Sequence, residues 1–319
     1  MALAHALSWS VSRAGTFDAC RRRYYLDYYL GWNGWLRSAP ESRQLAWRLK
    51  KMTRMPMLAG DVLHQAIAEH FDRRAEGREL PREELLALAL KKLRAGYKES
   101  RDGAGLWRDK PSQSVHLAEH HYEESCVDES TSAAGDYGKR FVGRLEAGAA
   151  CFFEESRLAA VREVAPGDLL CVEGRAPARR DVRDLPTIEL ACTPVYAIPD
   201  LALRLDGRVH VYDWKSGSPR PQDEFQLGVY ALYAAETWGV APEEVVCVDA
   251  YLTRGELVEK VHTREELEAI QARVEASLAE MRDLHFAADD DLGDEAAFPR
   301  VEEGSRECES CNYRQLCDR

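Results

Sequence analysis

Residues 198–217 read IPDLALRLDGRVHVYDWKSG, and this stretch decides the fold that we expect for the chain. Its second half alternates in the manner of a β-strand and follows the turn signal Asp206-Gly207. Because side chains on a strand alternate between its two faces, Asp213 and Lys215 point the same way. Asp200 opens the preceding strand-like run, so a hairpin through the turn would fold it back beside Asp213.

Two adjacent carboxylates and a lysine indicate a metal-dependent phosphodiesterase. The carboxylates repel each other, and a divalent cation that prefers oxygen ligands relieves the repulsion. The metal lowers the pKa of a bound water and stabilises charge on the scissile phosphate. Lys215 would then handle the attacking water and the phosphate charge. Asp-x-Lys is common, however, and an exposed hairpin with an ordinary Asp–Lys pair has the same letters.

Two helical stretches supply further polar side chains. Gln226 and Tyr230 stand four residues apart in the helical pattern of residues 222–238, so they share one face. Upstream, a helical stretch opens at Gly60 and carries His64 on an apolar face. A lone histidine on such a face is more often a core residue than a ligand, so this pattern alone leaves both readings open.

Together these residues resemble the RecB-like branch of the PD-(D/E)XK nuclease superfamily. Its motifs are Gly-x-x-x-His, Asp, (Asp/Glu)-x-Lys and Gln-x-x-x-Tyr, in that chain order. The chain has all four in order: Gly60 to His64, Asp200, Asp213-x-Lys215, and Gln226 to Tyr230. One departure is Ala197, which stands where the family often has glycine.

The resemblance implies a role for each matching residue. His64, Asp200 and Asp213, with the backbone carbonyl of Trp214, would bind Mg or Mn. Lys215 would be the catalytic lysine, beside the catalytic carboxylates. Gln226 and Tyr230 would position the nucleic acid or the active site.

The nine cysteines fall into two groups. Five are scattered and are expected to be small buried apolar residues: Cys126, Cys151, Cys171, Cys192 and Cys247. The others are Cys308-x-x-Cys311 and Cys317 near the C-terminus, with Cys20 as the candidate fourth member. A tetrahedral metal or a cubane cluster needs four such ligands.

This cysteine spacing again resembles a subset of RecB-like nucleases, the CRISPR-associated exonucleases and the AddB-type helicase–nuclease subunits. The resemblance implies a structural 4Fe–4S cluster that clasps the two ends of the chain together. Arg21 replaces the proline that usually follows the first cysteine. From spacing alone, zinc is the second alternative and disulfides are the third.

The charge is distributed unevenly. The net charge is −12, yet residues 1–110 hold 21 Lys and Arg against 13 Asp and Glu. That part contains Arg21, Arg22, Arg23 and Tyr24, a cationic and aromatic run typical of single-strand nucleic-acid binding. The alternative is that the aromatic rings are core packing and the arginines a solvated face.

Composition bounds the remaining organisation. No apolar run approaches the roughly 18 residues of a membrane span, and the N-terminus lacks a signal-peptide pattern. We therefore expect a cytoplasmic protein with no membrane association. A single elaborated domain is expected, with these parts: a basic and aromatic arm with Cys20 (1–57), a helical lobe (58–165), a catalytic core (166–286), and an acidic linker with the cysteine cluster (287–319).

The expected fold class is α/β, a restriction-endonuclease-like core with a central mixed sheet flanked by helices. Helices are expected at 58–100, 136–162, 222–238 and 263–286, with a polar surface excursion at 101–135. Strands are expected at 168–174, 187–191, 195–205, 208–214 and 245–252.

The resemblance implies a metal-dependent DNA nuclease, an exonuclease acting on single-stranded DNA or DNA ends. The setting would be DNA repair, recombination, or anti-phage and CRISPR-type defence, with a helicase or defence-complex protein as partner. The alternative is a non-catalytic scaffold that binds nucleic acid within such a complex. A scaffold should have lost Asp200, Asp213 or Lys215, and none is lost. A zinc-stapled structural protein is a third hypothesis.

Overall fold

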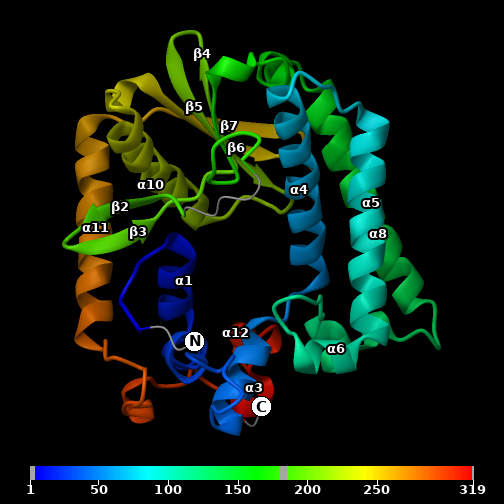
Figure 1. The fold of residues 1–319 in the computed structure, drawn as a ribbon, viewed down its shortest axis with the longest axis vertical. Coiled ribbons are helices and arrows are strands. Elements are labelled where there is room, and N and C mark those ends of the chain that lie inside the picture. The colour runs from blue at the N-terminus through cyan, green and yellow to red at the C-terminus, as the bar shows by residue number, and fades with distance from the viewer. Residues whose placement is uncertain (1–3, 180–184, 318–319) are drawn as a thin grey trace.

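The computed structural model describes residues 4–179 and 185–317 (Figure 1). Its centre is a five-stranded mixed sheet in the order β1-β4-β5-β6-β7. The strands are β1 (Leu169–Val172), β4 (Leu201–Leu205), β5 (Arg208–Lys215), β6 (Val245–Tyr251) and β7 (Glu256–Lys260). Only β5 and β6 run parallel, so α10 (Pro221–Trp238) serves as their crossover. This architecture confirms the expected α/β class with a central mixed sheet.

The β4–β5 hairpin is the predicted one. Leu201 pairs with Tyr212 and Leu205 with Arg208. Asp206 and Gly207 connect the strands with φ of 50° and 77°, as a tight two-residue hairpin turn requires. This register places Asp200, just before β4, level with Asp213 on β5.

Helices cover both faces of the sheet. One face packs on a helical lobe of α4 (Met55–Ala75), α5 (Arg82–Asp102) and α8 (Ala133–Glu154), on the right in Figure 1. The other face packs on α10 and α11 (Arg264–Asp283), on the left. All seven residues of β6 are buried, which explains its nearly continuous apolar sequence.

The two ends of the chain lie together below the sheet (Figure 1). The N-terminal part comprises α1 (Val11–Ala19), α2 (Arg21–Tyr25), the π-helical turn Leu26–Leu30 and α3 (Glu41–Lys50). The C-terminal part comprises α12 (Arg306–Glu309) and α13 (Arg314–Cys317). The Tyr313 hydroxyl donates to Asp27 at 3.0 Å, and the Asn312 amide donates to the Leu49 and Met52 carbonyls. Many apolar residues between 4 and 57 therefore belong to a hydrophobic core shared with the C-terminal part.

Several predicted boundaries were wrong. Residues 58–100 form two helices, because a turn at Gly77, with φ of 73°, and Pro81 interrupts them. Residues 195–205 contribute to two sheets, since β3 (Thr193–Tyr196) forms a separate two-stranded sheet with β2 (Thr187–Leu190). The pattern missed β7, a mostly exposed edge strand rich in charge. Residues 136–162 break at Glu155 before the short α9 (Ala159–Arg162).

Residues 101–135 are not a surface excursion. They form α6 (Ala104–Asp109) and α7 (Ala118–His121), and they bury Trp107, His116 and Glu119. The Glu119 carboxylate accepts hydrogen bonds from the Met55 N–H and the Tyr137 hydroxyl, both at 2.9 Å. The segment thus fixes the first turn of α4. None of the described helices has the length and apolar character needed to cross a membrane.

Candidate active site

The β4–β5 hairpin and α4 bring three of the predicted residues together. The Trp214 N–H donates to Asp200 Oδ2 at 2.6 Å, which fixes the Asp200 carboxylate next to that of Asp213. His64 on α4 points its Nδ1 at Asp200 Oδ1, 3.3 Å away. His64 is therefore not an apolar core residue, because its ring faces a carboxylate.

Gly60 lies one helical turn before His64 on α4 and faces the end of β5. A Cβ at residue 60 would lie 2.8 Å from Ser216 Oγ, a contact that rotation of the Ser216 side chain would relieve. The Gly-x-x-x-His spacing thus places both residues on the face of α4 that meets the hairpin.

Glu173 belongs to this group, and the sequence analysis missed it. It follows β1, and its N–H donates to the Asp200 carbonyl at 2.8 Å. His64, Glu173 and Asp200 are the one set of three or more metal-ligating side chains, within 4–179 and 185–317, whose ligand atoms all lie within 4.8 Å of one another. An acidic residue directly after a buried strand, in the Glu173-Gly174 turn, was the available signal.

Burial and mutual charge shift the pKa of each group. Burial lowers the pKa of His64, but Asp200 raises it more, to about 9. Burial raises the pKa of Asp200, yet the charge and hydrogen bond of His64 hold it below its ordinary value. Burial and the Asp200 charge raise the pKa of Asp213 well above its usual range, and the same causes raise that of Glu173 to about 7. These carboxylates crowd one another, as expected for groups that share a cation.

The donor set fits a hard divalent cation such as Mg or Mn. Asp200, Asp213 and Glu173 offer carboxylate oxygens, and His64 offers a ring nitrogen. One carboxylate oxygen of Glu173 is buried without a hydrogen-bond partner, an arrangement that a bound cation would satisfy. Ligation by the Trp214 carbonyl stays a prediction, since the contact seen at Trp214 is its N–H.

Lys215 stands beside this group and begins a chain of hydrogen bonds. Its ammonium forms an ion pair with Asp213 and donates to Gln226 Oε1 at 2.8 Å. Gln226 Nε2 donates to the Tyr230 hydroxyl at 2.7 Å, and that hydroxyl donates to the Ile198 carbonyl at 3.0 Å. The chain links Lys215 to the backbone just before Asp200. Tyr230 is buried, so it suits positioning of the site and not a contact with nucleic acid. A nucleic-acid contact of the half-buried Gln226 stays a prediction.

Two more aspartates surround Lys215, and the sequence analysis missed both. Asp223 Oδ1 lies 3.6 Å and Asp249 Oδ1 3.8 Å from the ammonium nitrogen. Asp249 lies on β6, directly across from Asp213 in the parallel register. Burial raises the pKa of Asp249 to about 6, with Lys215 opposing and Asp223 adding to that rise. The signal was the single charge inside the otherwise apolar run 245–252.

The structure brings the four predicted cysteines into one neighbourhood. Burial raises the pKa of Cys311 and of Cys317, and the charge of Cys20 adds to both shifts. Cys308 adds to the shift at Cys311. Backbone N–H groups of Arg23 and Tyr313 donate to the sulfurs of Cys20 and Cys311, both at 3.4 Å.

Four thiolates would carry a large negative charge, and cations lie close by. Arg22 interacts with Cys20 and Cys317, while Arg300 donates to the Cys317 carbonyl at 3.0 Å. Such donors and charges fit a thiolate-bound metal or cluster. Within the described chain no three of the sulfurs lie within 4.8 Å of one another, so the ligand set itself stays a prediction.

Of the predicted nucleic-acid contacts in the arginine run, Tyr24 needs correction, and those of the arginines stay predictions. Tyr24 is fully buried against Phe17 and Phe298, so no face of its ring can stack on a base. Arg21 pairs with Glu280, and Arg22 with Glu295. These ion pairs join the N-terminal helices to the acidic C-terminal half. The arginines lie beside a buried aromatic core, where nearby carboxylates neutralise their charges. Among the residues that the structure describes, none of the ion pairs involves Arg23, and its role stays a prediction.

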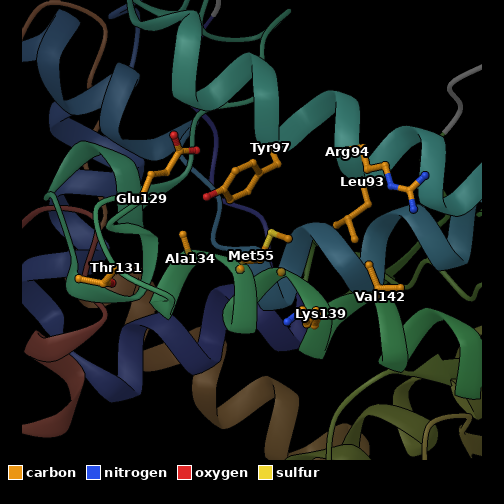
Figure 2. Close-up of a pocket in the computed structure, with 11 residues that line it drawn as sticks. Met55, Leu93, Arg94, Tyr97, Glu129, Thr131, Ala134, Lys139 and Val142 are labelled. Atoms are coloured by element: carbon orange, nitrogen blue, oxygen red, sulfur yellow. The ribbon is translucent and has the colours of Figure 1, made fainter.

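A cavity of about 490 Å³ lies apart from this site, in the helical lobe between α5 and α8. Figure 2 shows Tyr97 and Leu93 of α5 on one side and Val142 of α8 on the other, with Met55 between them. Its lining is mostly apolar and contains no metal-ligating cluster. It plays no part in the chemistry of the candidate site.

Comparison with known proteins identifies the superfamily of the chain. A stretch of 53 residues is 47% identical to the "Gene 69 protein" of Mycobacterium phage D29. That match covers 17% of this chain and 19% of the phage protein, so it spans about a fifth of that relative. The family model described as PD-(D/E)XK nuclease superfamily matches residues 8–318, which include the hairpin, His64 and all four clustered cysteines. The chain therefore belongs to the PD-(D/E)XK nuclease superfamily.

Proposed function

We propose that this protein is a metal-dependent deoxyribonuclease of the RecB-like type, an exonuclease that acts on single-stranded DNA or DNA ends. The observation that carries the proposal is the convergence of His64, Glu173 and Asp200, with Asp213 next to Asp200 and ion-paired with Lys215. The complete motif set favours an enzyme over a scaffold module, because a scaffold has no need of an intact Asp200, Asp213 and Lys215.

His64, Glu173, Asp200 and Asp213 would hold Mg or Mn. When bound, that ion supplies a water of lowered pKa and stabilises negative charge on the phosphate. Asp200 is held ready by the Trp214 N–H, so the ligand does not need to be ordered at the moment of binding. Lys215 presents its ammonium to the phosphate oxygens and the attacking water. Gln226 and Tyr230 fix the position of that ammonium.

The cysteine neighbourhood would hold a 4Fe–4S cluster, with zinc as the alternative. Cys20 belongs to the N-terminal helices and Cys308, Cys311 and Cys317 to the C-terminal ones, so ligation would close nearly the whole chain into one loop. A cross-link between such distant residues stabilises mainly by restricting the unfolded chain. We expect anaerobically purified protein to be brown and to contain iron, and a Cys311→Ser variant to lose it. A colourless protein with stoichiometric zinc would favour the zinc site.

Cleavage of end-labelled DNA tests the function. Single- and double-stranded substrates are incubated with Mn and either the wild-type protein or Lys215→Ala. We expect shortening of single strands from an end by the wild type and a loss of about 100-fold or more in the variant, the size seen when a charge-stabilising group is removed. Absence of Lys215-dependent cleavage on every DNA substrate would refute the enzyme. Internal cuts in circular single strands would refute strict end dependence.

A further inference from the structure

Three aspartates form a row across neighbouring strands at the candidate site. The β4–β5 register sets Asp200 level with Asp213, and the β5–β6 register sets Asp213 across from Asp249. Carboxylates directly opposite one another in a sheet destabilise it unless cations lie between them. The metal proposed above accounts for Asp200 and Asp213. It leaves Asp249 unexplained.

Asp249 is an unusual residue for a structural role. It is 2% exposed, and its Oδ1 has no hydrogen-bond partner, although that atom faces the Lys215 ammonium at 3.8 Å. A buried carboxylate oxygen without a hydrogen bond costs stability, so its position beside the ammonium calls for a reason. Asp223 approaches the same ammonium at 3.6 Å, but its other oxygen accepts from the Arg220 N–H and the Tyr251 hydroxyl. Asp223 therefore has a separate structural task as the cap of α10. Asp249 also has a hydrogen bond with the Tyr251 side chain, but its Oδ1, the atom that faces Lys215, has none.

These two carboxylates lie where they can compete with Asp213 for Lys215. A lysine ammonium is a point charge on a flexible stem, so it moves to the strongest negative neighbour. In contact with Asp213 alone, the ammonium would neutralise a carboxylate that a divalent cation needs. Its positive charge would also lie next to that cation without a further carboxylate to neutralise it, and two close positive charges repel strongly in a buried site.

We propose that Asp249, assisted by Asp223, is a positioning residue that holds the Lys215 ammonium away from the metal-binding side of Asp213. The inference rests on the proposed function, because it explains how the lysine of that reaction is positioned. Gln226, on α10, fixes the same position of the ammonium through its 2.8 Å hydrogen bond. The ammonium already contacts Asp213 Oδ2, while Asp249 and Asp223 attract it from the other side. Without Asp249 the ammonium would shift further onto the Asp213 carboxylate, compete with the divalent cation, and be misplaced for the phosphate.

The test is a double-mutant cycle read out by Mn²⁺ binding, with free Mn²⁺ measured by electron paramagnetic resonance. The four proteins are the wild type, Asp249→Asn, Lys215→Met and the double variant. We expect Asp249→Asn to weaken Mn²⁺ binding about tenfold, the lower end of the range for groups that orient metal ligands. In the Lys215→Met background the same substitution should weaken binding by no more than about twofold, because no ammonium remains to compete. An equal loss in both backgrounds would overturn the proposal.

Kinetics gives a second readout. At saturating Mn²⁺, Asp249→Asn should lower kcat by about 10- to 100-fold and leave KM for DNA within about twofold, since the lysine is misplaced but the DNA surface is intact. The matched control is Glu259→Gln, which removes a charge from the exposed face of β7 and should behave as wild type. Asp223→Asn, which keeps an oxygen for the Arg220 N–H, replaces Asp249→Asn if that variant fails to fold. Wild-type kcat and wild-type Mn²⁺ affinity in a folded variant would refute the inference.

The two proposals fail separately. If the wild type binds Mn²⁺ but cleaves no DNA, the proposed function is wrong, and the binding cycle alone still decides the role of Asp249. If the wild type cleaves DNA but the cycle shows no coupling between residues 249 and 215, the nuclease stands and the positioning role is refuted.

Discussion

Glu124 connects the cysteine-bearing C-terminus to the helix that carries His64, and its neutralisation should loosen that connection. Its carboxylate accepts from Arg314 at 2.7 Å through one oxygen and from Arg54 at 2.6 Å through the other. Arg314 lies between Cys311 and Cys317, and Arg54 immediately precedes α4. Glu124→Gln removes the charge and keeps the shape, so it tests the electrostatic link alone.

The magnitude follows from two charge-assisted hydrogen bonds among side chains that are about one-fifth exposed. Each such bond contributes about 1.5–3 kcal/mol when buried, and partial exposure reduces each to about 1 kcal/mol. We therefore expect Glu124→Gln to lower the free energy of unfolding by about 2 kcal/mol. Burial raises the pKa of Glu124, but hydrogen bonds from Arg54 and Arg314 lower it more. The contribution is thus complete above the unfolded pKa near 4.5 and is lost as the pH falls below it.

Urea unfolding at pH 7.5, followed by circular dichroism and tryptophan fluorescence, measures the effect. Glu129→Gln is the matched control, because its ion pair with Arg101 is largely exposed and should contribute little to stability. A loss for Glu124→Gln no larger than that of the control would refute the reasoning. So would a loss of 2 kcal/mol that persists unchanged at pH 3.5, where the carboxylate is protonated in the unfolded chain.

Three other predictions follow from buried groups. Gly34→Ala should lower the free energy of unfolding by about 1–3 kcal/mol, because a Cβ there meets the Arg43 carbonyl and lies 2.6 Å from Trp47 Cβ. Its control is Gly143→Ala in α8, which has open space around it and should raise the free energy of unfolding by up to about 1 kcal/mol in the same denaturation assay. Burial lowers the pKa of His116 from 6.5 to about 4, so the unfolded chain binds a proton at a higher pH than the folded protein does. The stability that is complete above pH 6.5 should therefore fall by about 1–2 kcal/mol by pH 5. His116→Phe should flatten this part of the pH–stability curve, and an unchanged slope would exclude His116 as the cause of the pH dependence. Tyr230→Phe breaks the hydrogen-bonded chain from Lys215 to the Ile198 carbonyl and should lower kcat for DNA cleavage about tenfold with KM unchanged, whereas a rise in KM alone would indicate a direct nucleic-acid contact.

Local patterns were sufficient wherever neighbouring residues set the structure. The Asp206-Gly207 turn and the alternation of residues 208–215 predicted the hairpin, because turn geometry and strand periodicity are properties of adjacent residues. The same periodicity failed at β7, where both faces are too polar to mark a strand, and at residues 101–135. There, the polar composition predicted exposure, but Glu119 is buried, because its carboxylate accepts hydrogen bonds from residues far away in the chain.

The sequence by itself determined the sheet class, the hairpin, and the order of Asp200, Asp213, Lys215, Gln226 and Tyr230, since short spacings fix which side chains share a face. Only the tertiary structure decided that His64 faces Asp200, that Glu173 joins them, and that Asp223 and Asp249 surround Lys215. It also decided that Tyr24 is core and that Arg21 and Arg22 pair with acidic side chains. The physical reason is that these contacts join residues from separate elements, and their distances depend on how helices and strands pack and not on any local repeat.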